Sequence, residues 1–181
     1  MSTESVAPAP APQPEAKKPS VLKKILGYIV GLIVAAGVIY AFNYFTSDEA
    51  QAKAGDCAHI TGTSNNPNYK AVDCTSAEAN YVVGQAFGSL SETCKDKYVE
   101  YTYSQRRGPK TKLCLAPVLV EGTCYGEDGD NVNPKVVGCT ETATFKVTKA
   151  VKDAAAPQCA EGEEAFTFPE AKLNYCLGAP A

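Results

Sequence analysis

Residues 55–75, GDCAHITGTSNNPNYKAVDCT, return in altered form as residues 122–140, GTCYGEDGDNVNPKVVGCT. At a shift of 65 positions Asn66 falls on Asn131 and Cys74 on Cys139, and later Cys94 falls on Cys159. Both stretches are followed by an aromatic-Thr-aromatic strand and a closing Cys-Leu. The sequence therefore predicts a tandem duplication, with one unit over residues 55–117 and a second over residues 118–181.

Each predicted unit is about 60 residues long, a size at which a chain buries little apolar surface and often needs covalent cross-links. Four of the eight cysteines lie in each unit, widely spaced and without a CxxC pair. This pattern favours structural disulfides over thiol chemistry or a zinc site, whose ligands usually come in close pairs. The expected disulfide residues are Cys57, Cys74, Cys94, Cys114, Cys124, Cys139, Cys159 and Cys176.

Four cysteines allow three pairings in each unit, and the sequence leaves all three open. Equivalent units should pair alike, and sequential pairing closes the shortest loops. We therefore expect the bonds Cys57–Cys74, Cys94–Cys114, Cys124–Cys139 and Cys159–Cys176.

Runs of β-branched and aromatic residues in both units are typical of short antiparallel strands, and the Asn-Pro and Gly-Pro sequences are typical of turns. A short helical turn is expected at residues 89–97, capped by Ser89 or Ser91. The expected strands are residues 69–72, 81–87, 99–103 and 112–115 in the first unit and residues 135–137, 143–151, 165–168 and 173–177 in the second.

Before the units lies Ile25–Phe45, ILGYIVGLIVAAGVIYAFNYF, 21 consecutive residues without a charge. About 20 apolar residues suffice for a helix to cross a hydrocarbon core about 30 Å thick. Lysines at positions 17, 18, 23 and 24 precede this stretch, and Asp48 and Glu49 follow it. The positive-inside rule then predicts a single-pass protein of the plasma membrane, with a cytoplasmic N-terminus and an exported C-terminal region.

The predicted fold class is mainly β, with one N-terminal transmembrane helix and two tandem disulfide-stapled units. A cleaved signal peptide is the alternative, because Ala50-Gln51-Ala52 resembles a cleavage site, but the apolar run is longer than a usual signal core. A lipoprotein is excluded, because Cys57 follows Asp56 and lies well outside the apolar run.

Two flanking segments complete the organisation. Residues 1–24, rich in Ala and Pro, are expected to be a disordered cytoplasmic tail, either a spacer or a ligand for a proline-recognising partner. Residues 46–54 are expected to be a short charged linker. Within the helix, Gly27, Gly31 and Ala35 recur at four-residue spacing, a pattern that allows two membrane helices to associate closely and predicts a weak homodimer.

Charge argues against nucleic acid as a partner. From residue 47 onward the chain carries 13 Lys and Arg against 18 Asp and Glu, a net charge of −5. Nucleic-acid-binding domains usually carry a basic excess instead.

No residues form a recognisable catalytic, metal or cofactor site. His59, the sole histidine, lacks a matching residue in the second unit and is interpreted as a surface residue rather than a catalytic base. The acidic run at residues 127–131 lacks the ligand spacing of a calcium loop, because Val132 and Pro134 interrupt it. We therefore expect the protein not to be an enzyme.

A basic loop in the first unit is the strongest candidate for a contact with an anionic partner. Arg106, Arg107, Lys110 and Lys112 surround a predicted turn. Basic residues near an anionic surface contribute about 1 kcal/mol each. The loop is either such a contact, with an envelope polymer or lipid headgroups, or an exposed hairpin kept soluble by charge.

The GDC opening, the stretch VDCTSAEANYVVG and the closing LCL are similar to the LppU-type family of actinobacterial cell-envelope domains. The resemblance implies an envelope address and disulfides, and no defined activity; the chain departs from the family name by lacking a lipobox. We expect a non-enzymatic membrane protein that presents its duplicated domain to an envelope protein or polymer. The alternative is a ligand-binding or sensor module that signals through association of the membrane helix.

Overall fold

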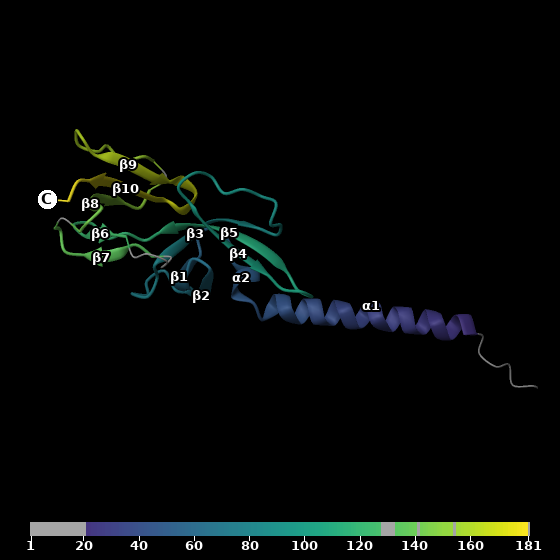
Figure 1. Ribbon diagram of the computed structural model, residues 1–181. Coiled ribbons are helices and arrows are strands. Elements are labelled where there is room, and N and C mark those ends of the chain that lie inside the picture. Colours follow the sequence, from purple (N-terminus) through teal and green to yellow (C-terminus); the bar gives the residue numbers. More distant parts are fainter. Residues whose placement is uncertain (1–20, 128–132, 141, 154, 181) are drawn as a thin grey trace, which may run out of the picture. The chain divides into compact units, whose positions relative to one another are not determined.

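The computed structural model describes residues 21–127, 133–140, 142–153 and 155–180 (Figure 1). The tail predicted at residues 1–24 and the acidic run at residues 127–131 therefore lie largely outside the described residues. The chain divides into two compact parts within its first helix. One part ends at Gly37 and the other begins at Val38.

The first helix, α1, runs from Val21 to Phe45. Its stretch Ile25–Phe45 has a mean hydropathy of 2.4 and is long enough to cross a membrane. Side chains from residue 25 to residue 42 are exposed all around the helix, whereas a helix on the surface of a water-soluble domain has a polar face. The predicted apolar helix is confirmed. Its length and composition fit a membrane span, and a signal sequence near the N-terminus can have the same length and composition.

Two five-stranded antiparallel sheets with the same strand order make up most of the chain from Val38 onward. The first sheet has the order β2-β1-β3-β5-β4 and the second the order β7-β6-β8-β10-β9, so the strands correspond one to one. The mainly β fold with two tandem units is confirmed. The strands are β1 (Cys57–Thr63), β2 (Asn66–Val72), β3 (Tyr81–Phe87), β4 (Val99–Ser104), β5 (Lys110–Pro117), β6 (Cys124–Gly126), β7 (Lys135–Val137), β8 (Phe145–Val151), β9 (Glu164–Phe168) and β10 (Leu173–Gly178), with a 3-10 turn η1 (Pro169–Ala171) before β10.

The Gly-x-Cys openings of the two units have the same backbone geometry. Gly55 and Gly122 adopt φ values of +94° and +79°, which residues with a side chain rarely tolerate. Each donates its N–H over 2.7 Å to the carbonyl of a fully buried valine, Val83 in the first unit and Val147 in the second. The two glycines are therefore required at the point where the chain enters each sheet.

The four disulfides join the cysteines in sequential pairs, as predicted. Each bond stays within one unit, and the sequence separations are 17, 20, 15 and 17 residues. In the loop-entropy account, closing a loop of this length stabilises the fold by about 3 kcal/mol. The bonds hold the connections β2–β3 and β3–β4, and their counterparts in the second sheet, which have little regular structure of their own.

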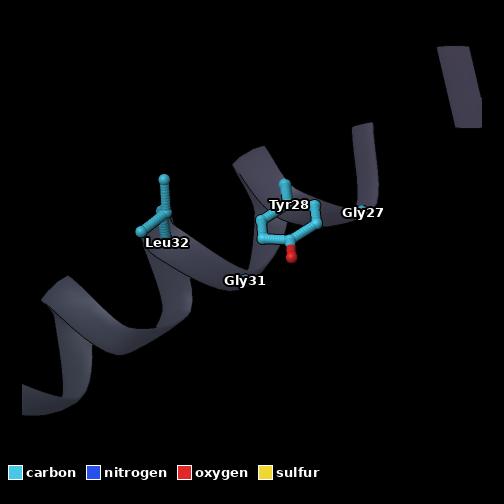
Figure 2. A pocket seen from close by; sticks show the side chains of 4 residues that line it. All are labelled: Gly27, Tyr28, Gly31 and Leu32. Atoms are coloured by element: carbon cyan, nitrogen blue, oxygen red, sulfur yellow. The ribbon is translucent and has the colours of Figure 1, made fainter. Parts of the chain in front are cut away.

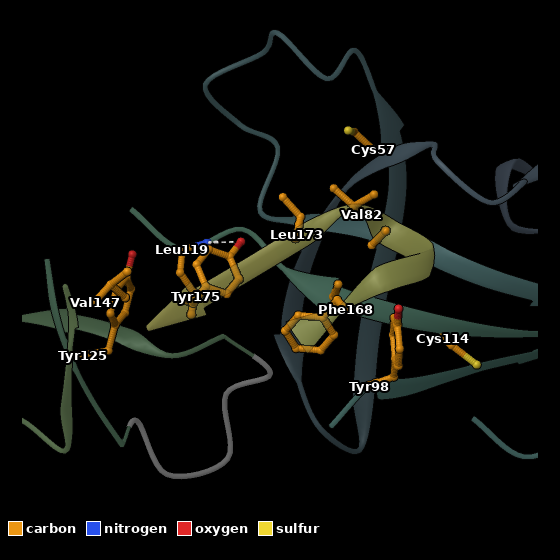
Figure 3. Packing of buried hydrophobic residues seen from close by; sticks show 12 residues of the cluster. Cys57, Val82, Tyr98, Cys114, Leu119, Tyr125, Val147, Phe168, Leu173 and Tyr175 are labelled. Carbon is orange, nitrogen blue, oxygen red and sulfur yellow. Dashed lines mark hydrogen bonds between the residues drawn. The ribbon is translucent and has the colours of Figure 1, made fainter. Parts of the chain in front are cut away.

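One apolar core is shared by both sheets (Figure 3). Phe168 is fully buried and meets the ring of Tyr98 edge-on, with ring centroids 5.0 Å apart. The Tyr175 hydroxyl donates to the carbonyl of Pro117 over 2.9 Å and accepts from the Leu119 N–H over 3.2 Å. The two units, each with its own disulfides, are therefore not independent of each other in packing.

The first sheet also buries its other face. Ile60, Tyr69, Tyr101 and Leu113 belong to a second cluster there, with Ala52 packed against it. The interior strand β5 is buried over most of its length as a result, which explains its continuous apolar run rather than an alternating one.

Three predictions about local structure need correction. Strands β1 and β6 were not expected, because His59 and Gly62 weaken the strand pattern of β1 and β6 is only three residues long. Residues 89–97 form no helix; the Ser89 hydroxyl accepts from the Ser91 N–H in a tight turn. Pro67 lies inside β2 rather than in a turn, and it is tolerated because β2 is an edge strand.

The buried tyrosines predict a stability limit at alkaline pH. Burial raises the pKa of Tyr69, Tyr81 and Tyr175 to about 12, whereas a tyrosine in an unfolded chain has a pKa of about 10. Their contribution to stability is therefore complete below pH about 10 and is lost as the pH rises towards about 12.

We expect tyrosinate absorbance to rise in two phases, the second coinciding with loss of the β-sheet circular dichroism signal. Tyr81→Phe should reduce the amplitude of the second phase. Ionisation of all tyrosines in one step near pH 10, with the sheets intact, would contradict this account.

The shared core predicts that damage to one sheet unfolds both. Phe168→Ala should lower the free energy of unfolding by about 3–5 kcal/mol, as for other buried aromatic residues. Val136→Ala, at a side chain that is 64% exposed on β7, is the matched control and should change it by less than about 0.5 kcal/mol. In urea unfolding we expect a single transition for both proteins, with a lower midpoint in Phe168→Ala than in wild type. Two transitions, of which only one has a lower midpoint in the variant, would show that the sheets fold separately.

Candidate functional site

The segment that follows α1 is folded onto the first sheet. Helix α2 (Asp48–Gln51) begins at Ser47, a buried residue whose hydroxyl accepts from the Ala50 N–H over 3.3 Å. Asp48 accepts from the Ala71 N–H of β2 over 3.3 Å. Glu49 accepts from the Ser47 hydroxyl over 2.9 Å and from the Tyr101 hydroxyl over 3.4 Å. Both acidic residues are thus bound to residues of the first sheet or of their own turn.

This packing changes the interpretation of residues 46–54. The sequence suggested a linker, and the structure instead places Ala52 against the apolar cluster that includes Tyr69 and Tyr101. The chain then enters the sheet through two hydrogen bonds from backbone donors: the Lys53 N–H donates to the Asp56 carboxylate over 2.7 Å, and the Gly55 N–H donates to the Val83 carbonyl. The end of α1 is therefore followed by packed structure.

The basic hairpin between β4 and β5 lies beside the last turn of α1. The Asn43 side-chain amide donates to the carbonyl of Arg107 over 3.4 Å, across 64 positions of sequence. A side chain at Gly108 would come within 3.2 Å of the Asn43 side chain. Tyr40 and Tyr44 of α1 line a cavity of about 250 Å³ together with Pro109, Lys110 and Thr111 of the hairpin.

The four basic residues predicted as one contact divide into three exposed residues and one buried residue. Arg106, Arg107 and Lys110 are exposed at the hairpin tip. Lys112 is only 8% exposed, and its ammonium group lies 3.1 Å from the Glu100 carboxylate. The Cys94 N–H first, and Lys112 second, lower the pKa of the Glu100 carboxyl. Lys112 therefore belongs to the sheet rather than to a contact surface.

The predicted helix-association face is open. No atom of the described chain outside the helix lies within 4 Å of a side chain built at Gly27 or Gly31. Together with Tyr28 and Leu32 these glycines line a groove on α1 (Figure 2). Ala35, one turn further along, is exposed as well. The geometry needed for close approach of a second helix is present on this face.

A cleft of about 290 Å³ lies between the two sheets, at the Cys57–Cys74 disulfide. Its floor is apolar, with Val82 and Leu173 among the lining residues. Two lysines also line it, Lys152 after β8 and Lys172 after η1, and Lys172 adopts a left-handed φ of +53°. Apolar side chains with a few charged residues are the usual lining of a small-molecule site.

Neither His59 nor a cysteine cluster forms a reactive centre in the part of the chain that the structure describes. The Nδ1 atom of His59 lies 2.6 Å from the Glu78 carbonyl, a contact that positions the loop after β2. Cys159, Glu163 and Cys176 lie close enough to hold a metal. Both sulfurs are joined in a disulfide, however, so neither is a thiolate ligand.

The sequence did not indicate the meeting of Asn43 with the hairpin, because contacts between residues so far apart leave no local pattern. The cap at Ser47 was recognisable, since a serine followed by two acidic residues is typical of a helix start. Comparison of the chain with protein-family models, with curated proteins and with solved structures finds no match.

Proposed function

We propose that this chain is a non-enzymatic single-pass membrane protein that holds a disulfide-stabilised domain at the outer surface of the plasma membrane, for interaction or scaffolding in the cell envelope. The observation that carries the proposal is the packed junction: α2 and residues 52–56 join the apolar helix to the first sheet without a free linker. A domain mounted in this way is held close to the bilayer.

Two further observations support the exported address. Four disulfides and the absence of free cysteines among the described residues are typical of proteins in oxidising compartments. Lysines before the helix and acidic residues after it favour a cytoplasmic N-terminus. The resemblance to the LppU-type family agrees with an envelope address. The partner in this proposal is an envelope protein or polymer.

The proposal predicts that the intact chain of 19.1 kDa stays in alkali-washed membranes. Alkaline phosphatase fused after residue 181 should be active in a bacterial host, because that enzyme needs an oxidising compartment, whereas a fused green fluorescent protein should be dark. Release of a shorter soluble fragment would identify the helix as a cleaved signal sequence. An inactive phosphatase fusion would contradict the orientation.

A ligand-binding sensor is the second candidate function, and the cleft between the sheets is the observation that favours it. In this proposal a small amphipathic anion occupies the cleft, and the open face at Gly27, Gly31 and Ala35 brings two helices together. The two features are separate in sequence, so each can be altered without the other.

The sensor proposal predicts that Gly31→Leu abolishes cross-linking of the full chain in membranes, because a large side chain prevents close helix approach. Ile33→Leu, at a nearby exposed position of α1, is the matched control and should leave cross-linking unchanged. Equal cross-linking of wild type and Gly31→Leu would count against signalling through this face.

A further inference from the structure

We propose that the tip of the β4–β5 hairpin binds the headgroup phosphates of anionic phospholipids through Arg106, Arg107 and Lys110. The inference rests on the proposed function, since it takes α1 as a membrane span. It adds to that proposal a lipid partner and the surface of the domain that faces the bilayer.

The hairpin tip lies beside the end of the membrane span. Asn43 lies two residues before the end of α1, at the level where an apolar span gives way to headgroups. Tyr40 and Tyr44 flank it, and tyrosine rings favour this interface. The Arg107 carbonyl accepts from the Asn43 side chain. A hairpin tip that touches this turn of the helix is therefore at headgroup level.

Within the described residues, no carboxylate neutralises the charge at the tip. The first unit carries seven basic residues. Four of them, Lys70, Lys95, Lys97 and Lys112, form ion pairs with glutamates. Among the described residues the other three, Arg106, Arg107 and Lys110, have no carboxylate partner, and all three lie in this hairpin.

The carboxylates nearest in sequence to the helix end are bound elsewhere. Asp48 accepts from the Ala71 N–H, and Glu49 accepts from the hydroxyls of Ser47 and Tyr101. Neither forms an ion pair with the hairpin. The three cations are thus free to meet phosphate groups, which arginine binds through two parallel N–H donors.

The tip also has a defined shape. The Gln105 N–H donates to the Pro109 carbonyl and the Gly108 N–H donates to the Gln105 carbonyl, both over 3.4 Å. A Cβ at Gly108 would lie 3.0 Å from the Gln105 Cβ and 3.2 Å from the Asn43 Cβ, so the tip packs closely at this position. A loop that is already ordered loses less conformational entropy on binding.

The test uses the full chain in nanodiscs of phosphatidylcholine with a minor fraction of phosphatidylglycerol. Spin-labelled lipids measure how strongly the protein prefers phosphatidylglycerol to phosphatidylcholine in its boundary layer. The test variant is Arg106→Gln/Arg107→Gln/Lys110→Gln. The matched control is Lys135→Gln/Lys146→Gln/Lys149→Gln, which removes the same charge from β7 and β8. The lysines before the apolar stretch Ile25–Phe45 are present in every variant and cancel in the comparison.

We expect wild type and control to prefer phosphatidylglycerol. The preference of the hairpin variant should be weaker than that of wild type, on the order of tenfold. High salt should reduce the wild-type preference towards the variant's value, because exposed charges are screened. Equal lipid preference in the hairpin variant and the control would overturn the inference. The inference would also be overturned if the wild-type protein in phosphatidylcholine nanodiscs bound soluble polyphosphate through the hairpin but showed no lipid preference. That result would indicate an anionic polymer as the ligand instead. A cleaved or inverted helix in the fusion experiment would contradict the proposed function, and that result is read independently of the lipid preference.

Discussion

The hydrogen bonds of Ser47, Asp48 and Glu49 are the constraint on which the placement of the domain depends. They fold the chain onto the first sheet directly after the apolar helix, so that Ala52 covers the cluster around Tyr69 and Tyr101. Without them, residues 46–54 would be a flexible connection, and the hairpin tip would have no fixed relation to Asn43. With them, one edge of the domain is held at the end of the helix. Among the described residues, the contact with the helix end is made by the first tandem unit, residues 55–117, and not by the second.

Packing and covalent bonds stabilise the domain in different ways. The disulfides act within each unit and hold long connections that bury few side chains. The core formed by Tyr98, Phe168 and Tyr175 acts between the units and joins the two sheets. Each unit alone is small for an independent core. Sharing one core enlarges the buried apolar surface without lengthening the chain, and so complements the disulfides.

Much of the architecture was predictable from the sequence, because it follows from local or repeated patterns. The apolar run from Ile25 to Phe45, the strands other than β1 and β6, and the sequential pairing of the cysteines all carry such patterns. Strand β1 was missed, since its second half is exposed and rich in glycine and threonine. The shared core and the contact of Asn43 with Arg107 could not be predicted, because they join residues far apart in sequence. The burial of Lys112 has the same origin: its partner Glu100 lies on the neighbouring strand.

Amide hydrogen exchange of the full chain in nanodiscs tests the packed junction most directly. The N–H groups of Ala50, Gly55 and Asp56 are hydrogen-bonded, as is the N–H of Ala71 that meets Asp48. The account predicts that these amides exchange slowly and lose protection together with strand β2, because they belong to one folded unit. Exchange of residues 47–56 at the rate of an unfolded chain, while both sheets stay protected, would show a flexible linker and contradict the placement of the domain at the membrane.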